Sequence, residues 1–120
     1  MTVQIPGIDA EKGLDLYDDD MEIYLSVLHS YISNTPAVLD KLRTVSAETL
    51  QDYFAGVHGV KGTSASIGAE DLRNTAAKLE AMARAGDLSG VLAQNDAFIK
   101  YAATIVDNIK SWLAKYDAGH

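Results

Sequence analysis

The chain of 120 residues contains no cysteine. This absence excludes disulfide bridges, cysteine-ligated zinc, iron–sulfur clusters and thiol catalysis. Basic residues are also few, because 10 Lys and Arg stand against 17 Asp and Glu, for a net charge of −7. A nucleic-acid binder needs a basic surface to displace counterions, and an anionic membrane surface attracts basic segments. Neither nucleic acid nor a membrane is therefore expected as a partner.

Long apolar runs are missing as well, since no stretch reaches about 18 apolar residues and none is predicted to span a bilayer. The first residues, Met1–Pro6, lack the basic and apolar regions of a secretory signal, and the arm that Pro6 and Gly7 close is expected to be loose. The remaining composition, 48% apolar and 22% charged, is that of an ordinary folded domain. We expect one cytoplasmic domain over residues 1–120, with its ordered core at about 8–116.

Apolar residues recur at three- and four-residue spacing through most of the chain, which is the pattern of amphipathic helices. No segment alternates with a period of two, so strands are not expected. We predict a short helix over 8–17 that Asp9 caps, and four long helices that begin near Met21, Ser46, Glu70 and Leu88. Short connections favour antiparallel neighbours, hence an all-α, up-and-down four-helix bundle with a short additional N-terminal helix. Such a bundle closes its own core, and a monomer is expected.

Two local features refine the helix boundaries. The run Asp18-Asp19-Asp20 is interpreted as a helix start and not as a metal site, because carboxylates accept the unpaired N–H groups there and the further ligands of a calcium loop are missing. Asp19 with Glu22 has nearly the form of a capping box. Pro36 cannot donate a backbone hydrogen bond, so a kink or a brief break is predicted near residues 33–35.

Of the three histidines, His120 is terminal and His29 is interpreted as a solvated residue at the edge of an apolar stripe. His58 lies roughly 110° from the centre of the apolar stripe of its helix, so it should face solvent on the flank of the bundle. The residues that share this flank are small or neutral: Gln51, Ala55, Gly62 and Ala65. Lys61, three residues on, is close enough to place an ammonium beside whatever the imidazole carries.

Three glycines, Gly56, Gly59 and Gly62, occupy the middle of the same helix, where each costs up to ~1 kcal/mol relative to Ala. Close packing of a neighbouring helix explains Gly56 but not Gly62, which projects toward solvent beside His58. His58 is thus expected to be exposed, with the cation of Lys61 nearby and no side chain at Gly62. This arrangement is typical of a nucleophile that a large partner must approach. From these residues alone, a chance surface histidine stays an open alternative.

The segment His58-Gly59-Val60-Lys61-Gly62-Thr63-Ser64, with Gly68 after it, resembles the H-x-x-K-G-[ST]-[ST/A]…G signature of histidine-containing phosphotransfer (HPt) domains. The similarity covers residues 8–115 and includes Ile8-Asp9 with Gly13-Leu14, an acidic start to the second helix, and Leu72…Ala76…Leu79-Glu80. Gly59 departs from the family pattern, which often has a small hydroxyl residue or Ala there. We expect this departure to loosen the helix without changing the chemistry.

The resemblance implies a phosphorelay carrier of two-component signal transduction, and not an enzyme with autokinase activity. The receiver domain of a response regulator or of a hybrid sensor kinase would dock with its phosphoaspartate over His58, and a second receiver would later remove the phosphoryl group. Lys61 would offset the charge of that group, Gly62 would give access, and Gly68 would shape the turn after the helix. The docking surface would include Gln51, Ala55, Gly62, Ala65 and Glu80. No metal or cofactor is expected on this chain, because the magnesium ion would belong to the receiver.

Larger histidine kinases offer the nearest alternative. The phosphoacceptor segment of a sensor kinase would have an acidic residue after its histidine and a proline further on, whereas Gly59 follows His58 and no proline occurs after Pro36. The chain leaves no room for a nucleotide-binding domain beside five helices. A phosphoacceptor module of a larger hybrid or chemotaxis-type kinase stays open, although Met1 and the polar tail 117–120 favour a free-standing protein.

Two further classes differ in chemistry. A di-iron bundle needs Glu-x-x-His pairs, but Ser26 precedes His29 by three residues and Ala55 precedes His58 by three. That class is therefore excluded. A structural or adaptor bundle, in which the histidine is incidental, remains the alternative to a phosphoryl carrier.

Overall fold

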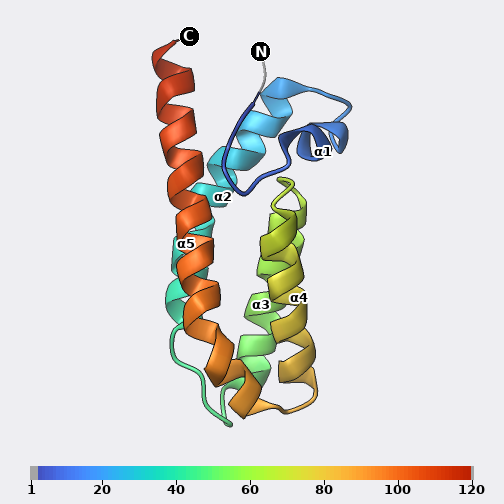
Figure 1. Ribbon diagram of the computed structural model, residues 1–120, viewed down its shortest axis with the longest axis vertical. Coiled ribbons are helices and arrows are strands. Elements are labelled where there is room, and N and C mark those ends of the chain that lie inside the picture. The colour runs from blue at the N-terminus through green and yellow to red at the C-terminus, as the bar shows by residue number, and fades with distance from the viewer. Residues whose placement is uncertain (1–2, 120) are drawn as a thin grey trace.

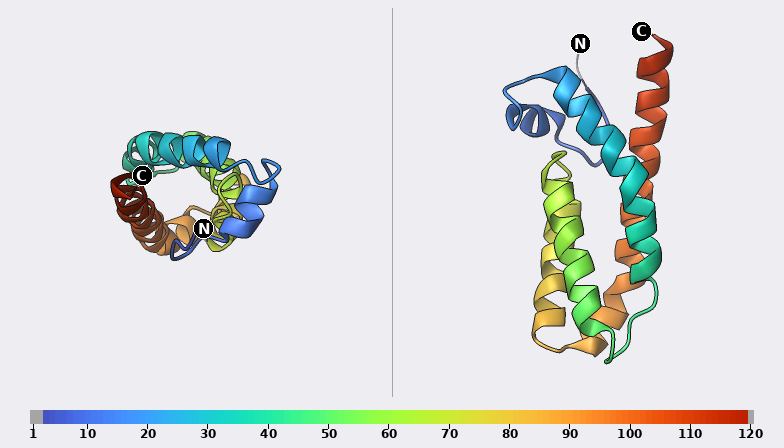
Figure 2. Two further views of the ribbon diagram at one scale, coloured as in Figure 1. Left: turned by 90° about the horizontal axis from the view of Figure 1, so that it is seen from above. Right: turned by 180° about the vertical axis from the view of Figure 1, so that it is seen from behind.

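Five α-helices make up the computed structural model, which describes residues 3–119. They are α1 (Ala10–Asp15), α2 (Met21–Leu42), α3 (Leu50–Ala65), α4 (Glu70–Arg84) and α5 (Leu88–Ala118). Helices α2 to α5 run up and down in turn, and α5 packs against both α4 and α2, which closes a ring around the core (Figure 1; Figure 2, left). The described residues contain no strand. The predicted all-α, up-and-down bundle with a short N-terminal helix is confirmed.

The core is built from the apolar stripes that the spacing predicts, and Leu28, Val57, Leu79 and Ile109 are fully buried in it. The apolar spacing of the last helix also predicts Leu92 on its buried stripe, and this prediction is wrong, since Leu92 is 54% exposed. Val91 and Asn95, four residues apart, hold the inward positions there, and Leu92 lies about 100° around the helix from Val91. Asn95 is buried because it accepts from the Tyr53 hydroxyl and donates to the Leu42 carbonyl, both at 2.7 Å.

Helix α2 continues through Pro36, so the break considered near residues 33–35 does not occur. Proline removes one hydrogen bond and strains the preceding turn, at a cost of about 3 kcal/mol. Thr35 and Leu39, on either side of it, are both buried in the same stripe. Each buried leucine-sized side chain contributes about 1.5–3 kcal/mol, and Tyr31 before Pro36 and Leu39 and Leu42 after it are all buried, so the packing of both halves outweighs that cost.

The start of α2 corrects the predicted capping box. Asp20, not Asp19, is the N-cap, and its side chain accepts from the backbone N–H of Ile23 at 3.2 Å. Asp18 and Asp19 have φ angles of +54° and +60°. Aspartate adopts this left-handed conformation more readily than most residues, so the acidic run forms a turn whose last member caps the helix.

The start of α3 also differs from the prediction, because the helix begins at Leu50 and not directly after Ser46. Residues 46–49 form a separate turn, in which the Ser46 N–H donates to Thr49 Oγ1 at 2.9 Å. Thr49 then occupies the N-cap position without a side-chain cap. The Thr49 hydroxyl does not cap the helix because it already accepts the hydrogen bond from Ser46.

The N-terminal segment and α1 lie across the end of the bundle where α3 connects to α4 (Figure 1). The arm is not loose, since Val3 and Ile5 are buried and the Pro6 carbonyl accepts from the Asn108 side chain at 3.0 Å. Asp9 caps α1 as predicted, although α1 is shorter than the predicted 8–17. Val3 and Ile5 thus pack in the core, although the short sequence of the arm has no pattern that predicts their burial.

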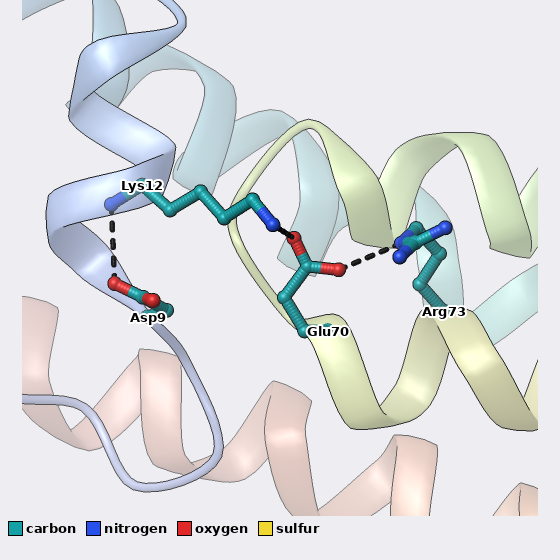
Figure 3. A network of polar contacts seen from close by, with 4 residues as sticks. All are labelled: Asp9, Lys12, Glu70 and Arg73. Atoms are coloured by element: carbon teal, nitrogen blue, oxygen red, sulfur yellow. Dashed lines mark hydrogen bonds and ion pairs between the residues drawn. The ribbon is translucent and has the colours of Figure 1, made fainter.

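Gly68 and a charged network join α1 to the turn between α3 and α4. Gly68 has a φ of +83°, its carbonyl accepts from the Asp9 N–H at 2.8 Å, and a Cβ there would lie 2.2 Å from the Asp9 oxygen. Glu70 bonds Lys12 at 2.8 Å and Arg73 at 2.7 Å (Figure 3). Lys12 first, and then Arg73, lower the pKa of Glu70. The Asp9–Gly68 and Lys12–Glu70 contacts hold the turn after α3 and the start of α4 against α1, whereas Arg73 bonds Glu70 within α4.

Candidate functional site

His58 lies in the middle of α3 on the surface of the bundle, and its side chain is 62% exposed. Its ring stacks on that of Phe54, one turn earlier, with centroids 6.2 Å apart and planes inclined by 16°. The aromatic neighbour restrains the imidazole and leaves much of it open to solvent. The predicted flank is seen around it: Gln51, Ala55 and Gly62 are exposed and Ala65 is half-buried.

A buried carboxylate supports the imidazole from below. Glu80 of α4, whose side chain is only 8% exposed, bonds His58 Nδ1 through Oε2 and accepts from Lys61 Nζ through Oε1 at 2.8 Å. The sequence suggested that Glu80 belongs to the docking surface, but its side chain is almost completely buried and offers little surface to a partner. Glu80 is the link that holds two side chains of α3 in one cluster.

The two partners of Glu80 favour its ionised form. The bonds from Lys61, and after it from His58, lower the pKa of Glu80, while burial acts in the opposite direction. An ionised carboxylate only accepts hydrogen bonds, so His58 Nδ1 must carry the proton that it shares with Glu80. In the neutral ring the lone pair is then on Nε2. The exposed imidazole is thereby presented in a single tautomer.

The glycines of α3 divide into two kinds. A Cβ at Gly56 would lie 2.6 Å from Leu42 Cδ2, so the close approach of α2 accounts for this glycine. A Cβ at Gly59 or Gly62 would meet nothing within 4 Å. Packing therefore does not require Gly62, and the space one turn from His58 is open.

The other candidates from the sequence do not join this cluster. His29 is exposed on α2, and His120 lies outside the described residues. Gly68 shapes the turn after α3 and lies two turns or more along the chain from His58. Within residues 3–119, no three His, Asp or Glu side chains are grouped so that they could hold a metal ion. None of the described helices is long and apolar enough to cross a membrane.

Sequence reasoning missed the roles of Glu80 and Phe54. The sequence signal for Glu80 is its position on the buried stripe of α4, because it lies four residues after Ala76 and three before Ala83, which are both buried. A charged residue on the buried stripe of a helix must find partners, and this register could have identified it as a central residue. The apolar spacing alone places Phe54 on the buried stripe of α3, but its half-buried ring lies at the edge of that stripe and stacks on the imidazole.

The lowered pKa of Glu80 gives a stability prediction. A carboxyl with a lowered pKa in the folded state contributes stability above its ordinary pKa of ~4.3 and loses it as the pH falls further. We expect Glu80→Gln to lower the free energy of unfolding by about 1–2 kcal/mol at neutral pH, and the difference to shrink between pH ~4.5 and 3. Urea titrations of both proteins across this pH range measure the difference in the free energy of unfolding.

Glu70→Gln is the control. Glu70 is more exposed than Glu80, so this substitution should lower the free energy of unfolding by less than about 1 kcal/mol. A constant difference at all pH values would contradict the electrostatic origin.

The Hpt domain model matches residues 19–117, which span α2 to α5 and include the whole cluster around His58. Comparison with curated proteins gave no match, and comparison with solved structures gave none either. A family match over this share of the chain agrees with the four-helix fold and with the motif that begins at His58. The resemblance seen in the sequence is confirmed, and the chain belongs to the Hpt domain family of histidine phosphotransfer modules that act in phosphorelays.

Proposed function

We propose that this protein accepts a phosphoryl group from the phosphoaspartate of a receiver domain onto His58 and passes it to the aspartate of another receiver. The main support is the bond between Glu80 and His58 Nδ1, which leaves the lone pair of the exposed ring on Nε2. The Nε2 lone pair forms the new N–P bond while the P–O bond of the acyl phosphate breaks and returns its electrons to the aspartate. The return step is the reverse. The protein acts as a carrier and needs no nucleotide of its own.

Glu80 has an electrostatic role in this step. When neutral His58 attacks, the ring becomes positively charged because Nδ1 keeps its proton. The carboxylate of Glu80 already accepts that N–H, so the developing charge meets a fixed negative group in a site partly shielded from water. Phosphoryl transfer requires mainly positioning and charge compensation, and this pair supplies both on the histidine side.

Lys61 and Gly62 complete the proposed machinery. Lys61 neutralises the buried Glu80 and holds its ammonium within one turn of His58, where it offsets charge on the phosphoryl group. Gly62, with the small residues Ala55 and Ala65, leaves room for the active-site loops of the receiver. The magnesium ion that assists the transfer would be held by the receiver. We infer that the protein works as a cytoplasmic monomer between receivers.

Pulse-chase transfer tests this function. A radiolabelled phosphorylated receiver is mixed with the protein, and label that is stable to base and labile to acid should move onto it and then onto a second receiver. Chelation of magnesium should stop both exchanges without removing label from protein already phosphorylated. Binding of receivers without any transfer of label would support the adaptor alternative and end the proposal.

Lys61→Ala should slow transfer about 10-fold and leave the affinity for the receiver nearly unchanged, because a charge contact that strengthens in the transition state lowers the rate without a matching loss of binding. Lys61→Met separates charge from packing, since the methionine keeps most of the apolar stem of the half-buried lysine. Rates and dissociation constants on the same samples measure both effects. Equal rates for Lys61→Met and the wild type would refute the electrostatic role.

A further inference from the structure

A second cation lies beside the histidine on the neighbouring helix. Arg84 ends α4, one turn after Glu80, and its guanidinium carbon is 5.2 Å from the centroid of the Phe54 ring. Phe54 in turn stacks on His58. A continuous row of side chains, Arg84, Phe54 and His58, thus crosses from α4 to α3 on the face that carries the imidazole.

Arg84 has no carboxylate partner among the described residues, although acidic residues outnumber basic ones in the chain. Lys61, the other cation beside His58, is engaged by Glu80. The contact with Phe54 holds the guanidinium in place but leaves its five N–H donors free for other acceptors. Arg84 therefore presents an exposed positive charge that lies over the ring of Phe54.

An open groove of about 440 Å³ lies next to this charge, between the first turns of α3 and the last turn of α4. Its lining residues are Ala47, Leu50, Gln51, Phe54, Ala83 and Arg84. Leu50 and Phe54 are half-buried and give it an apolar floor, and no acidic residue lines it. The groove begins one turn from His58, so a domain that docks over the histidine also covers it.

We propose that this groove selects the receiver: an apolar side chain of the receiver fills it, and an adjacent carboxylate of the receiver pairs with Arg84. This inference rests on the proposed function. The planar guanidinium matches a carboxylate in a two-pronged geometry, and a receiver with a basic residue at that point is repelled. Arg84 is thus a specificity residue for docking and takes no part in the transfer itself.

The matched pair of variants is Arg84→Glu and Lys78→Glu. Both lie on α4 and change the net charge equally, but Lys78 is exposed about 120° around the helix from Arg84 and forms no ion pair among the described residues. The probe is the receiver domain that exchanges phosphoryl groups fastest with the wild-type protein in a panel. Its dissociation constant should rise about 10-fold or more for Arg84→Glu, less for Arg84→Gln, and less than about 2-fold for Lys78→Glu.

Phosphoramidate, a small phosphoryl donor that needs no docking, separates binding from chemistry. It should label His58 of Arg84→Glu at the wild-type rate. Receiver variants with single acidic residues changed to Lys should include one that restores affinity for Arg84→Glu, as a charge-swap pair requires. Equal weakening by Lys78→Glu, unchanged affinity of Arg84→Glu, or phosphoramidate labelling that falls together with receiver transfer would each overturn the inference. Failure of the proposed function is distinct, because the wild type itself would then exchange label with no receiver.

Discussion

His58→Gln should take up no label from a phosphorylated receiver, while His29→Gln and His120→Gln are labelled as the wild type is. Glutamine has no ring nitrogen with a lone pair, so no N–P bond can form. Its side-chain amide can still donate to Glu80, and the wild-type imidazole is 62% exposed, so little packing is lost. Autoradiography after transfer measures the label, and circular dichroism with thermal melts measures the fold.

The outcome is decisive because the two histidines that the structure describes, His29 and His58, differ in their surroundings. His29 has an exposed position on α2 away from the cluster, whereas His58 has a buried carboxylate behind its ring. Acid-labile label that persists in His58→Gln would assign the phosphoryl group to another residue. A variant that melts much earlier than the wild type would show instead that the bond to Glu80 is needed for folding.

Gly62→Gln should fold at least as stably as the wild type and yet accept phosphoryl groups about 100-fold more slowly. A Cβ at Gly62 would meet nothing within 4 Å, so replacing this mid-helix glycine should raise the free energy of unfolding by up to ~1 kcal/mol. The long side chain stands one turn from His58, where the loops of the receiver must approach. A displacement of the reacting atoms by about 1 Å already costs about 100-fold in rate.

Gly59→Gln is the matched control on the same helix. A Cβ there would also meet nothing within 4 Å, so the stability gain should be similar. Gly59 points about 100° around α3 from His58, however, whereas Gly62 lies within about 40° of it, and the effect on transfer should be much smaller. Thermal melts and transfer rates of both variants test this. Equal rates for Gly62→Gln and the wild type would remove the access role, and unfolding would assign Gly62 to packing.

The local pattern of residues determined the helical architecture. Spacings of three and four set the apolar stripes, and these fix the number, order and inward faces of the helices. The same geometry places His58 on the flank, and it distinguishes Gly56, which meets Leu42, from Gly62, which meets nothing. These inferences succeed because each depends on one helix and on the angle between its own residues.

Tertiary structure alone decided which side chains meet. Glu80 is 22 residues from His58, and the register between α3 and α4 brings its carboxylate under the imidazole. The same register carries Arg84 to Phe54, and the packing of both halves of α2 keeps that helix continuous through Pro36. The period of a single helix carries no information about its offset along a neighbour, which depends on how all the side chains between the two helices pack. The sequence therefore identifies the exposed histidine, and the packed bundle supplies the carboxylate that bonds its ring.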